Sequence, residues 1–148
     1  MFQGLSYATV LVPDQDRALT FYIDTLEFKK REDFQMPDGK RWVSVAPPDE
    51  DYPRLAIVDA DDDHPRLPDD PDRKRDRIGS QVDDYVAFVF SVDDCRATYE
   101  QLIKSGVEFV TEPYETPWGV EASFRDPWGN VYEIVEPQRS DTSPPSTE

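Results

Sequence analysis

The chain has 148 residues, of which 32 are Asp or Glu and 16 are Lys or Arg, so its formal net charge is −16. This length fits one domain, or two small modules of about 60 residues that share a core. A surface this negative repels phosphate backbones and anionic lipids, which excludes nucleic acids and membranes as favoured partners. The sequence has no apolar run of the roughly 20 residues that span a bilayer, and its start lacks a basic-then-apolar signal pattern. We therefore expect a cytoplasmic protein.

The charge is also skewed by residue type. There are 21 Asp and 11 Glu, but 11 Arg and only 5 Lys. Asp-rich, Lys-poor surfaces suit a salt-rich cytosol, where screening shortens the range of self-repulsion. The composition therefore predicts halophilic adaptation, and the alternative is an acidic protein from an ordinary cell.

The first segment, residues 1–58, begins with an apolar, β-branched stretch that predicts a strand over 7–12. Asp14 is suited to cap a helix running to about residue 25, because apolar residues recur there at helical spacing. Three further strands are predicted, and an Asp-Gly turn joins the first two into a hairpin. These strands cover 28–34, 41–46 and 55–58.

Residues 59–79 are acidic and rich in proline, which predicts an exposed linker. His64, the only histidine, has carboxylate neighbours that favour its protonated form, so it is a poor metal ligand or catalyst. Four aspartates match ligand positions of a calcium loop, but His64 and Pro65 stand where that loop needs a glycine turn. We therefore expect a solvated charge run, which includes Asp59, Asp61, Asp63 and Asp70.

The second segment, residues 80–137, repeats the same order of elements about 80 residues later. A strand is followed by a helix that Asp93 or Asp94 caps and that ends before Gly106, and then by three strands. Cys95 belongs to the apolar stripe of this helix, with Tyr99, Leu102 and Ile103, so we expect a buried structural thiol rather than a nucleophile. The strands cover 85–92, 107–110, 120–125 and 131–135, and residues 138–148 form a tail expected to be disordered.

Both segments read βαβββ, and this duplication is the strongest signal in the sequence. A single sheet of this kind buries only the face under its helix, so the opposite faces must meet each other or a partner chain. The predicted fold class is therefore α+β, with two βαβββ modules that pair their curved mixed sheets around a central cleft. Strand alternation puts Tyr7 and Thr9 on the same face of the first sheet, and Tyr85 and Ala87 on the same face of the second.

Two motifs carry a family resemblance. Residues 12–14, followed by 17–22, are similar to a first strand-to-helix signature, and residues 124–133 are similar to a closing hairpin. On these motifs the chain resembles the glyoxalase/bleomycin-resistance/extradiol-dioxygenase superfamily, also called vicinal oxygen chelate proteins. Residues 41–48 and 93–100 are similar to a generic glyoxalase-like branch of that superfamily. One departure is Glu27, which stands where the family usually has Gly after the first helix, whereas the second segment keeps Gly106.

The resemblance implies a divalent-metal site with four ligand positions, usually His, Gln or Glu. Carried across, these positions fall on Tyr7, Ala87, the stretch 54–56 and Glu133. Only Glu133 is a normal ligand, because a phenol keeps its proton to about pH 10 and alanine has no donor atom. A divalent metal thus stays open, with three of four positions not normal ligands. Glu133 itself is a candidate metal ligand, a candidate catalytic base, or a solvated polar side chain.

Large aromatic side chains indicate what the cleft would hold. Trp42 and Trp118 lie on strand or strand-approach segments and could line a pocket for a mostly apolar or aromatic molecule. Arg125 or Arg41 could pair with an acidic group of that ligand. The alternatives are ordinary core packing for the aromatics and surface countercharge for the arginines. The predicted ligand-binding residues are Tyr7, Thr9, Trp42, Tyr85, Ala87, Trp118 and Arg125.

Three functions follow from these observations. The leading hypothesis is a small-molecule-binding protein of the antibiotic-resistance type, with a largely lost metal site and a homodimeric assembly. The alternative is a metal-dependent lyase, isomerase or dioxygenase that acts on a vicinal dioxygen substrate through Glu133. A third, weaker hypothesis is a protein whose acidic linker docks onto a basic partner surface.

Overall fold

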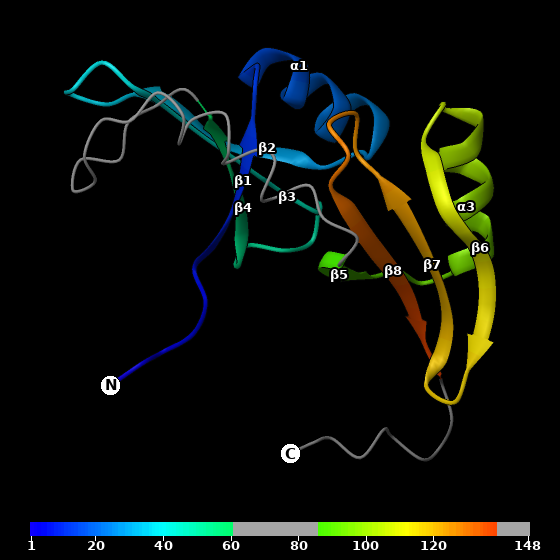
Figure 1. Ribbon diagram of the computed structural model, residues 1–148. Coiled ribbons are helices and arrows are strands. Elements are labelled where there is room, and N and C mark those ends of the chain that lie inside the picture. The colour runs from blue at the N-terminus through cyan, green and yellow to red at the C-terminus, as the bar shows by residue number, and fades with distance from the viewer. Residues whose placement is uncertain (61–85, 139–148) are drawn as a thin grey trace. The chain divides into compact units, whose positions relative to one another are not determined.

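The computed structural model describes residues 1–60 and 86–138, and the chain divides into two compact units, residues 1–81 and 82–148 (Figure 1). Each unit contains one four-stranded mixed sheet and its own helical segment. We call the units module 1 and module 2. Most of the predicted linker, including His64, lies outside the described residues. Tyr85, a predicted ligand-binding residue of the second segment, also lies outside them.

Module 1 has the predicted order of strand, helix and three strands. Its sheet runs β1-β4-β3-β2, with β1 parallel to β4 and the other pairs antiparallel. The elements are β1 (Tyr7–Val12), α1 (Gln15–Leu19), η1 (Thr20–Thr25), β2 (Lys29–Gln35), β3 (Arg41–Ala46) and β4 (Arg54–Asp59).

Module 2 repeats this topology, with the sheet order β5-β8-β7-β6 and β5 parallel to β8. The duplication predicted from the sequence is therefore confirmed for the order of elements and for their pairing. The elements are β5 (Val86–Ser91), α3 (Cys95–Lys104), β6 (Glu108–Thr116), β7 (Gly119–Arg125) and β8 (Val131–Pro137).

The helix starts follow the predicted caps. The carboxylate of Asp14 accepts a hydrogen bond from the backbone N–H of Arg17 at 3.1 Å, and Asp94 accepts one from Ala97 at 3.0 Å. Such caps satisfy N–H groups that have no partner within the helix. After Leu19 the first helix widens into the π-helix η1, whose last turn is closed by an i to i+5 bond into Leu26.

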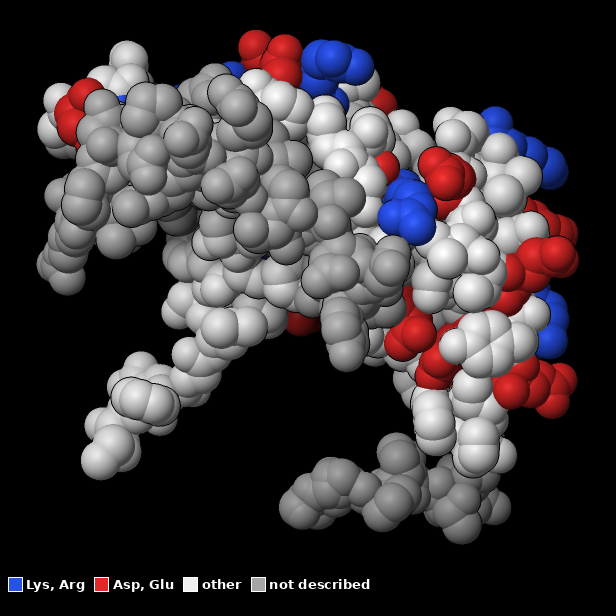
Figure 2. Space-filling view, in the orientation of Figure 1, with Lys and Arg blue, Asp and Glu red and all other residues white. Residues whose placement is uncertain are grey.

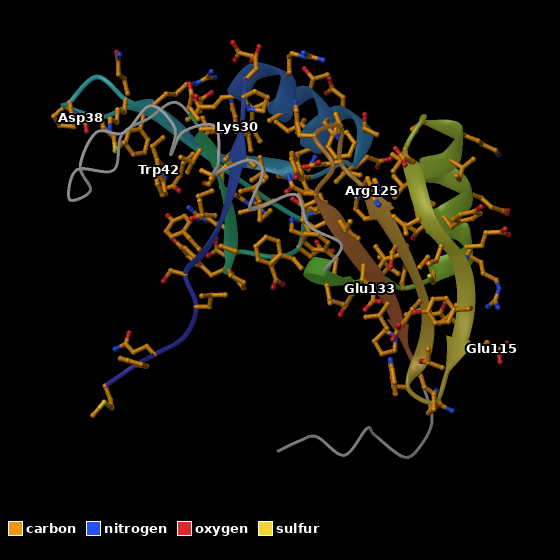
Figure 3. All side chains as sticks on the ribbon, viewed as in Figure 1. Lys30, Asp38, Trp42, Glu115, Arg125 and Glu133 are labelled. Carbon is orange, nitrogen blue, oxygen red and sulfur yellow. The ribbon has the colours of Figure 1, made fainter. Side chains whose placement is uncertain are left out.

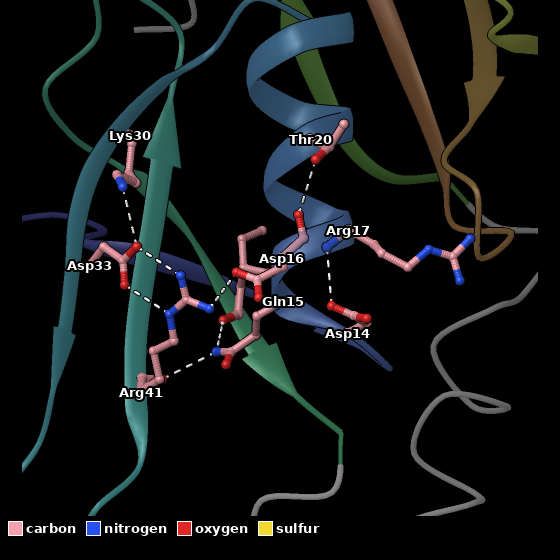
Figure 4. Close-up of polar contacts among 9 residues, drawn as sticks. Asp14, Gln15, Asp16, Arg17, Thr20, Lys30, Asp33 and Arg41 are labelled. Atoms are coloured by element: carbon pink, nitrogen blue, oxygen red, sulfur yellow. Dashed lines mark hydrogen bonds and ion pairs between the residues drawn. The ribbon is translucent and has the colours of Figure 1, made fainter.

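Polar contacts fix α1 on its sheet (Figure 4). The Gln15 amide donates to the backbone carbonyls of Arg41 at 3.1 Å and Ile57 at 2.9 Å, which lie on two different strands. The Arg41 guanidinium bridges Asp16 at 2.7 Å and Asp33 at 2.8 Å, and it lowers the pKa of Asp33 to about 2. Arg41, considered above as a partner for an acidic ligand, is thus paired with carboxylates of its own module.

The structure corrects two predictions in module 2. Strand β6 continues to Thr116 instead of ending at residue 110. Its register with β7 shifts twice, between Phe109 and Thr111 and between Thr111 and Tyr114. Pro113 is tolerated there because β6 is an edge strand, where a missing N–H breaks no ladder bond. Ile103, placed in the buried stripe of the helix, is instead 44% exposed, while Cys95 and Leu102 are buried.

The acidic character of the sequence shows on the surface of module 2. In the view of Figure 2, Asp and Glu side chains gather over α3 and β6. None of the helices in the described part of the chain is long and apolar enough to cross a membrane.

Candidate functional site

Alternation divides each sheet into a face under the helix and an opposite face, which we call the open face. Val10 and Val12 are buried beneath α1 and η1 in module 1, as predicted, and Phe88 stacks on the buried Tyr132 in module 2. The predicted cleft residues of module 1 therefore share its open face, with Tyr7 opposite Arg54 and Thr9 opposite Ala56.

One carboxylate organises the open face of module 1. Oε1 of Glu32, on β2, accepts hydrogen bonds from the hydroxyl of Tyr7 at 2.8 Å and from Nε1 of Trp42 at 2.9 Å. The Ser44 hydroxyl donates to the same oxygen at 2.7 Å, and the Arg54 guanidinium lies 3.5 Å from it. Glu32 thereby contacts residues from the other three strands of its sheet.

These donors hold the carboxylate in its charged form. Hydrogen bonds from Trp42 and Ser44 lower the pKa of Glu32 to about 2, against a smaller opposing effect of burial. The same contact acts in reverse on the phenol, because the bond to Glu32 raises the pKa of Tyr7 above 10. At neutral pH the network therefore contains an anionic acceptor and a protonated phenol, so Tyr7 is not a metal-ligating phenolate here.

Aromatic rings surround this carboxylate. Tyr7 meets Trp42 edge to face with ring centroids 5.2 Å apart, and it meets Tyr52 in the same way at 6.1 Å. The guanidinium carbon of Arg54 lies 4.3 Å from the centre of the Tyr52 ring, which is cation–π geometry. Tyr52 is 50% exposed and Trp42 is partly exposed, so rings of this group offer surface to a ligand (Figure 3).

Two carboxylates lie together on the open face of module 2. Glu121, on β7, is only 6% exposed, and its oxygens accept from the Tyr114 hydroxyl at 3.0 Å and from Nε1 of Trp118. Glu133, on β8 and labelled in Figure 3, pairs across the strands with Ser123. It is therefore the diagonal neighbour of Glu121. Burial, and then the negative charge and hydrogen bond of Glu121, raise the pKa of Glu133.

Strand register identifies the equivalent positions of the two modules. In module 1, Ala56 is paired with Thr9 on one side and Ser44 on the other. In module 2, Glu133 is paired with Val89 and Ser123 in the same way. Ala56 is therefore the counterpart of Glu133, and it defines the position that the sequence placed only within 54–56.

The residues at the four inherited positions do not fit a divalent-metal shell. Ala56 is fully buried and has no donor atom, Ala87 on β5 has none either, and the protonated Tyr7 hydroxyl donates a hydrogen bond to Glu32. Glu133 alone has a carboxylate. Within residues 1–60 and 86–138, no group of three or more His, Cys, Asp or Glu side chains is arranged to hold a metal ion.

The structure places the remaining predicted residues apart from one another. Trp118 follows the β6 strand and is 58% exposed beside Glu121, whereas Arg125 stands at the other end of β7. Arg125 lies 3.6 Å from Glu108 and donates to the carbonyl of Gly129, so its contacts are local. Thr9 is exposed on the edge strand β1.

Sequence reasoning missed the side chains that organise both open faces. Strand alternation could have placed Glu32 on the same face as Trp42, because the two strands form a tight hairpin. Tyr114 could not be found this way, because its strand was predicted to end four residues earlier. The missed residues are Glu32, Ser44, Tyr52, Tyr114 and Glu121, whereas Arg54 lies in the stretch 54–56 that the sequence named.

Comparison with known proteins now identifies the family. The family model described as Glyoxalase/Bleomycin resistance protein/Dioxygenase superfamily matches residues 4–134. The chain belongs to this superfamily. The crystal structure of UcmS2 is 36% identical, covers 92% of this chain and 99% of that one, and superposes with a TM-score of 0.77. TnmS3, described as an antibiotic binding protein from Streptomyces sp. CB03234, is 31% identical, with 93% and 98% of the two chains covered and a TM-score of 0.70.

A relative in Bacillus subtilis (strain 168) extends this set. The protein YurT, described as uncharacterized, is 35% identical over 130 residues, which cover 86% of this chain and 94% of YurT.

Proposed function

We propose that this protein binds a small, mostly apolar or aromatic molecule and sequesters it without converting it. The carrying observation is the open face of module 1, where the rings of Tyr7, Trp42 and Tyr52 meet around the charged Glu32. Binding sites for small molecules commonly combine aromatic surface with a few fixed polar groups. The 31% identity to TnmS3, described as an antibiotic binding protein, supports an antibiotic as the kind of ligand.

Single-tryptophan variants test this proposal directly. The chain has Trp42, Trp118 and Trp128, so a protein with Trp118 and Trp128 replaced by Phe reports from module 1 alone. Titration with a panel of aromatic antibiotics, bleomycin among them, and of simple fused-ring compounds should quench this Trp42 signal. Replacement of Trp42 by Phe should weaken binding in calorimetry. The proposal fails if no compound binds at concentrations up to about 1 mM, a limit that corresponds to about −4 kcal/mol.

Loss of the inherited metal site is part of the proposal. It rests on the buried Ala56 and on the absence of donor atoms from Ala87. Elemental analysis of protein purified without chelator should find far less than one equivalent of Mn, Fe, Ni or Zn. A stoichiometric metal that Glu133→Ala removes would overturn this part.

The Glu121–Glu133 pair favours an enzyme as the second candidate. A carboxyl group with a raised pKa beside a second carboxylate can hold its proton to a higher pH than an isolated carboxyl, and can then donate it or take one up. In this version the protein would be a lyase or isomerase that acts on a vicinal dioxygen substrate, with Glu133 as the catalytic acid or base. Turnover of such a substrate that Glu133→Gln abolishes, while binding persists, would favour this candidate over sequestration.

Assembly and location complete the proposal. In this proposal the protein is a cytoplasmic homodimer, and its net charge of −16 adapts it to high salt. Light scattering after gel filtration tests the dimer, and thermal unfolding tests the salt adaptation. Both are measured in about 0.1 M and about 2 M KCl, because screening differs strongly between these conditions. A monomer in both salts would contradict the dimer, and unchanged stability between them would contradict salt adaptation.

A further inference from the structure

The hydrogen bonds of Glu32 are distributed unevenly between its two oxygens. The donors Tyr7, Trp42 and Ser44 all bind Oε1, and the nearest contact of Arg54 is to the same atom. No described residue donates to Oε2. Because Oε1 is already surrounded, a further donor can reach this carboxylate only at Oε2. The side chain is 24% exposed, so this oxygen is not sealed beneath the rings.

A charged carboxylate oxygen is a strong acceptor and cannot donate. The pKa of Glu32 lies near 2, so it stays ionised across the physiological pH range. Partly exposed rings of Trp42 and Tyr52 lie in the same aromatic group, and Phe34, which pairs with Trp42 across the strands, is 50% exposed. A ring bound against these side chains would bring its substituents to the carboxylate.

We propose that Oε2 of Glu32 accepts a hydrogen bond from an N–H or O–H group of the ligand, so that module 1 selects aromatic molecules that carry a donor. This inference rests on the proposed binding function and names its ligand class: phenols, anilines, amides or amines attached to an aromatic ring. It also assigns separate roles to the two oxygens. Oε1 ties the four strands together, and Oε2 reads the ligand.

Glu32→Gln separates these roles. The Gln carbonyl oxygen can still accept from Tyr7, Trp42 and Ser44, while its amide N–H₂ replaces the open acceptor with a donor. Glu50→Gln, at an exposed glutamate of the same module, is the matched control for loss of one negative charge. The probes are 2-naphthol, which donates a hydrogen bond, and 2-acetylnaphthalene, which only accepts.

Dissociation constants for both probes are measured by calorimetry on the full chain. A hydrogen bond to a charged group contributes at least about tenfold in affinity, so the preference for 2-naphthol should fall about tenfold or more in Glu32→Gln. Glu50→Gln should leave the preference unchanged, and circular dichroism should show that both variants fold. If both probes bind and Glu32→Gln leaves their ratio unchanged, the inference is wrong and the binding function stands. If neither probe binds the wild-type chain, the proposed binding of aromatic molecules by this face is itself contradicted.

Discussion

The carboxylate pair of module 2 should make Glu133→Gln a stabilising substitution at neutral pH. Burial and the neighbouring Glu121 raise the pKa of Glu133 in the folded chain above its usual value of 4.5. A group with a raised folded pKa stabilises the fold fully below its unfolded pKa, and this contribution is lost as the pH rises through the folded pKa. Once the pH has risen through the folded pKa of Glu133, the wild-type chain carries two repelling charges at this pair, and Glu133→Gln carries one.

The size of the effect follows from the strand geometry. Diagonal neighbours on antiparallel strands bring their carboxylates within about 6 Å. At that separation, and with an effective dielectric constant of about 40 for a partly exposed pair, two unit charges repel by about 1.4 kcal/mol. Screening by salt reduces this further, so we expect Glu133→Gln to gain about 1 kcal/mol at pH 7.5 in low salt.

Urea unfolding at pH 4.5, 6 and 7.5 measures the difference in the free energy of unfolding between variant and wild type. The gain should grow with pH and shrink in about 1 M salt. Glu112→Gln removes the same charge from an exposed position on β6 and controls for the high net charge of the chain. A gain that is the same at every pH, or that Glu112→Gln reproduces, would refute the interaction between Glu121 and Glu133.

Three further predictions concern module stability. The pKa of Glu32 is lowered to about 2, so its stabilising contribution is present above pH 4.5 and is lost as the pH falls toward 2. Allowing for partial exposure, Glu32→Gln should lower the free energy of unfolding by about 1–2 kcal/mol at pH 7 and leave it unchanged near pH 2. Urea unfolding at a series of acid pH values measures this difference. Glu27 has φ 63°, so Glu27→Gly should raise stability by about 0.5–1 kcal/mol, whereas Gly106→Ala, at φ 90°, should lower it by about 1 kcal/mol in thermal unfolding. Gln15→Ala removes the donor to two strand carbonyls and should lower the free energy of unfolding by about 2 kcal/mol. Gln15→Glu should lower it by less than this at acid pH, because only a protonated carboxyl can donate a hydrogen bond.

Local rules predicted the scaffold well because its signals are contained in short stretches of chain. Asp14 and Asp94 cap helices through contacts only three residues away. Strand alternation puts Val10 and Val12 on the face of β1 opposite Tyr7 and Thr9, and both valines are buried as predicted. The departure at Glu27 from the family glycine also has a physical counterpart, since this residue adopts the left-handed conformation that glycine prefers.

The open faces could not be predicted in this way, because their contacts join distant residues. Glu32 lies in a run of charged residues that resembles a solvated strand, and only the pairing of β2 with β3 and the arrival of Tyr7 from β1 reveal its role. Glu121 has the same difficulty, since its partner Glu133 becomes a neighbour only after β7 and β8 pair. Propensity and periodicity carry no information about which polar side chains of different strands meet.

The duplication allows the two faces to be compared position by position, and the comparison separates what they share from what differs. On each open face, one carboxylate accepts hydrogen bonds from one tyrosine hydroxyl and one tryptophan N–H. In chain order, however, Glu32 lies on the second strand of its module (β2) and Glu121 on the third (β7). The shared motif therefore does not descend from equivalent positions of the repeat. The two carboxylates differ in the charged side chain that lies beside them: Arg54 is close to Glu32, whereas Glu133 is close to Glu121.

A cation beside one carboxylate and a second acid beside the other have opposite consequences for protons. The lowered pKa of Glu32 keeps module 1 a constant acceptor, while the raised pKa of Glu133 makes module 2 change its charge as pH changes. Any pH dependence of ligand binding above the ordinary carboxyl range should therefore come from module 2. In calorimetry, Glu133→Gln should remove this pH dependence and Glu32→Gln should leave it in place. The reverse result would show that the titrating group lies in module 1, not in module 2.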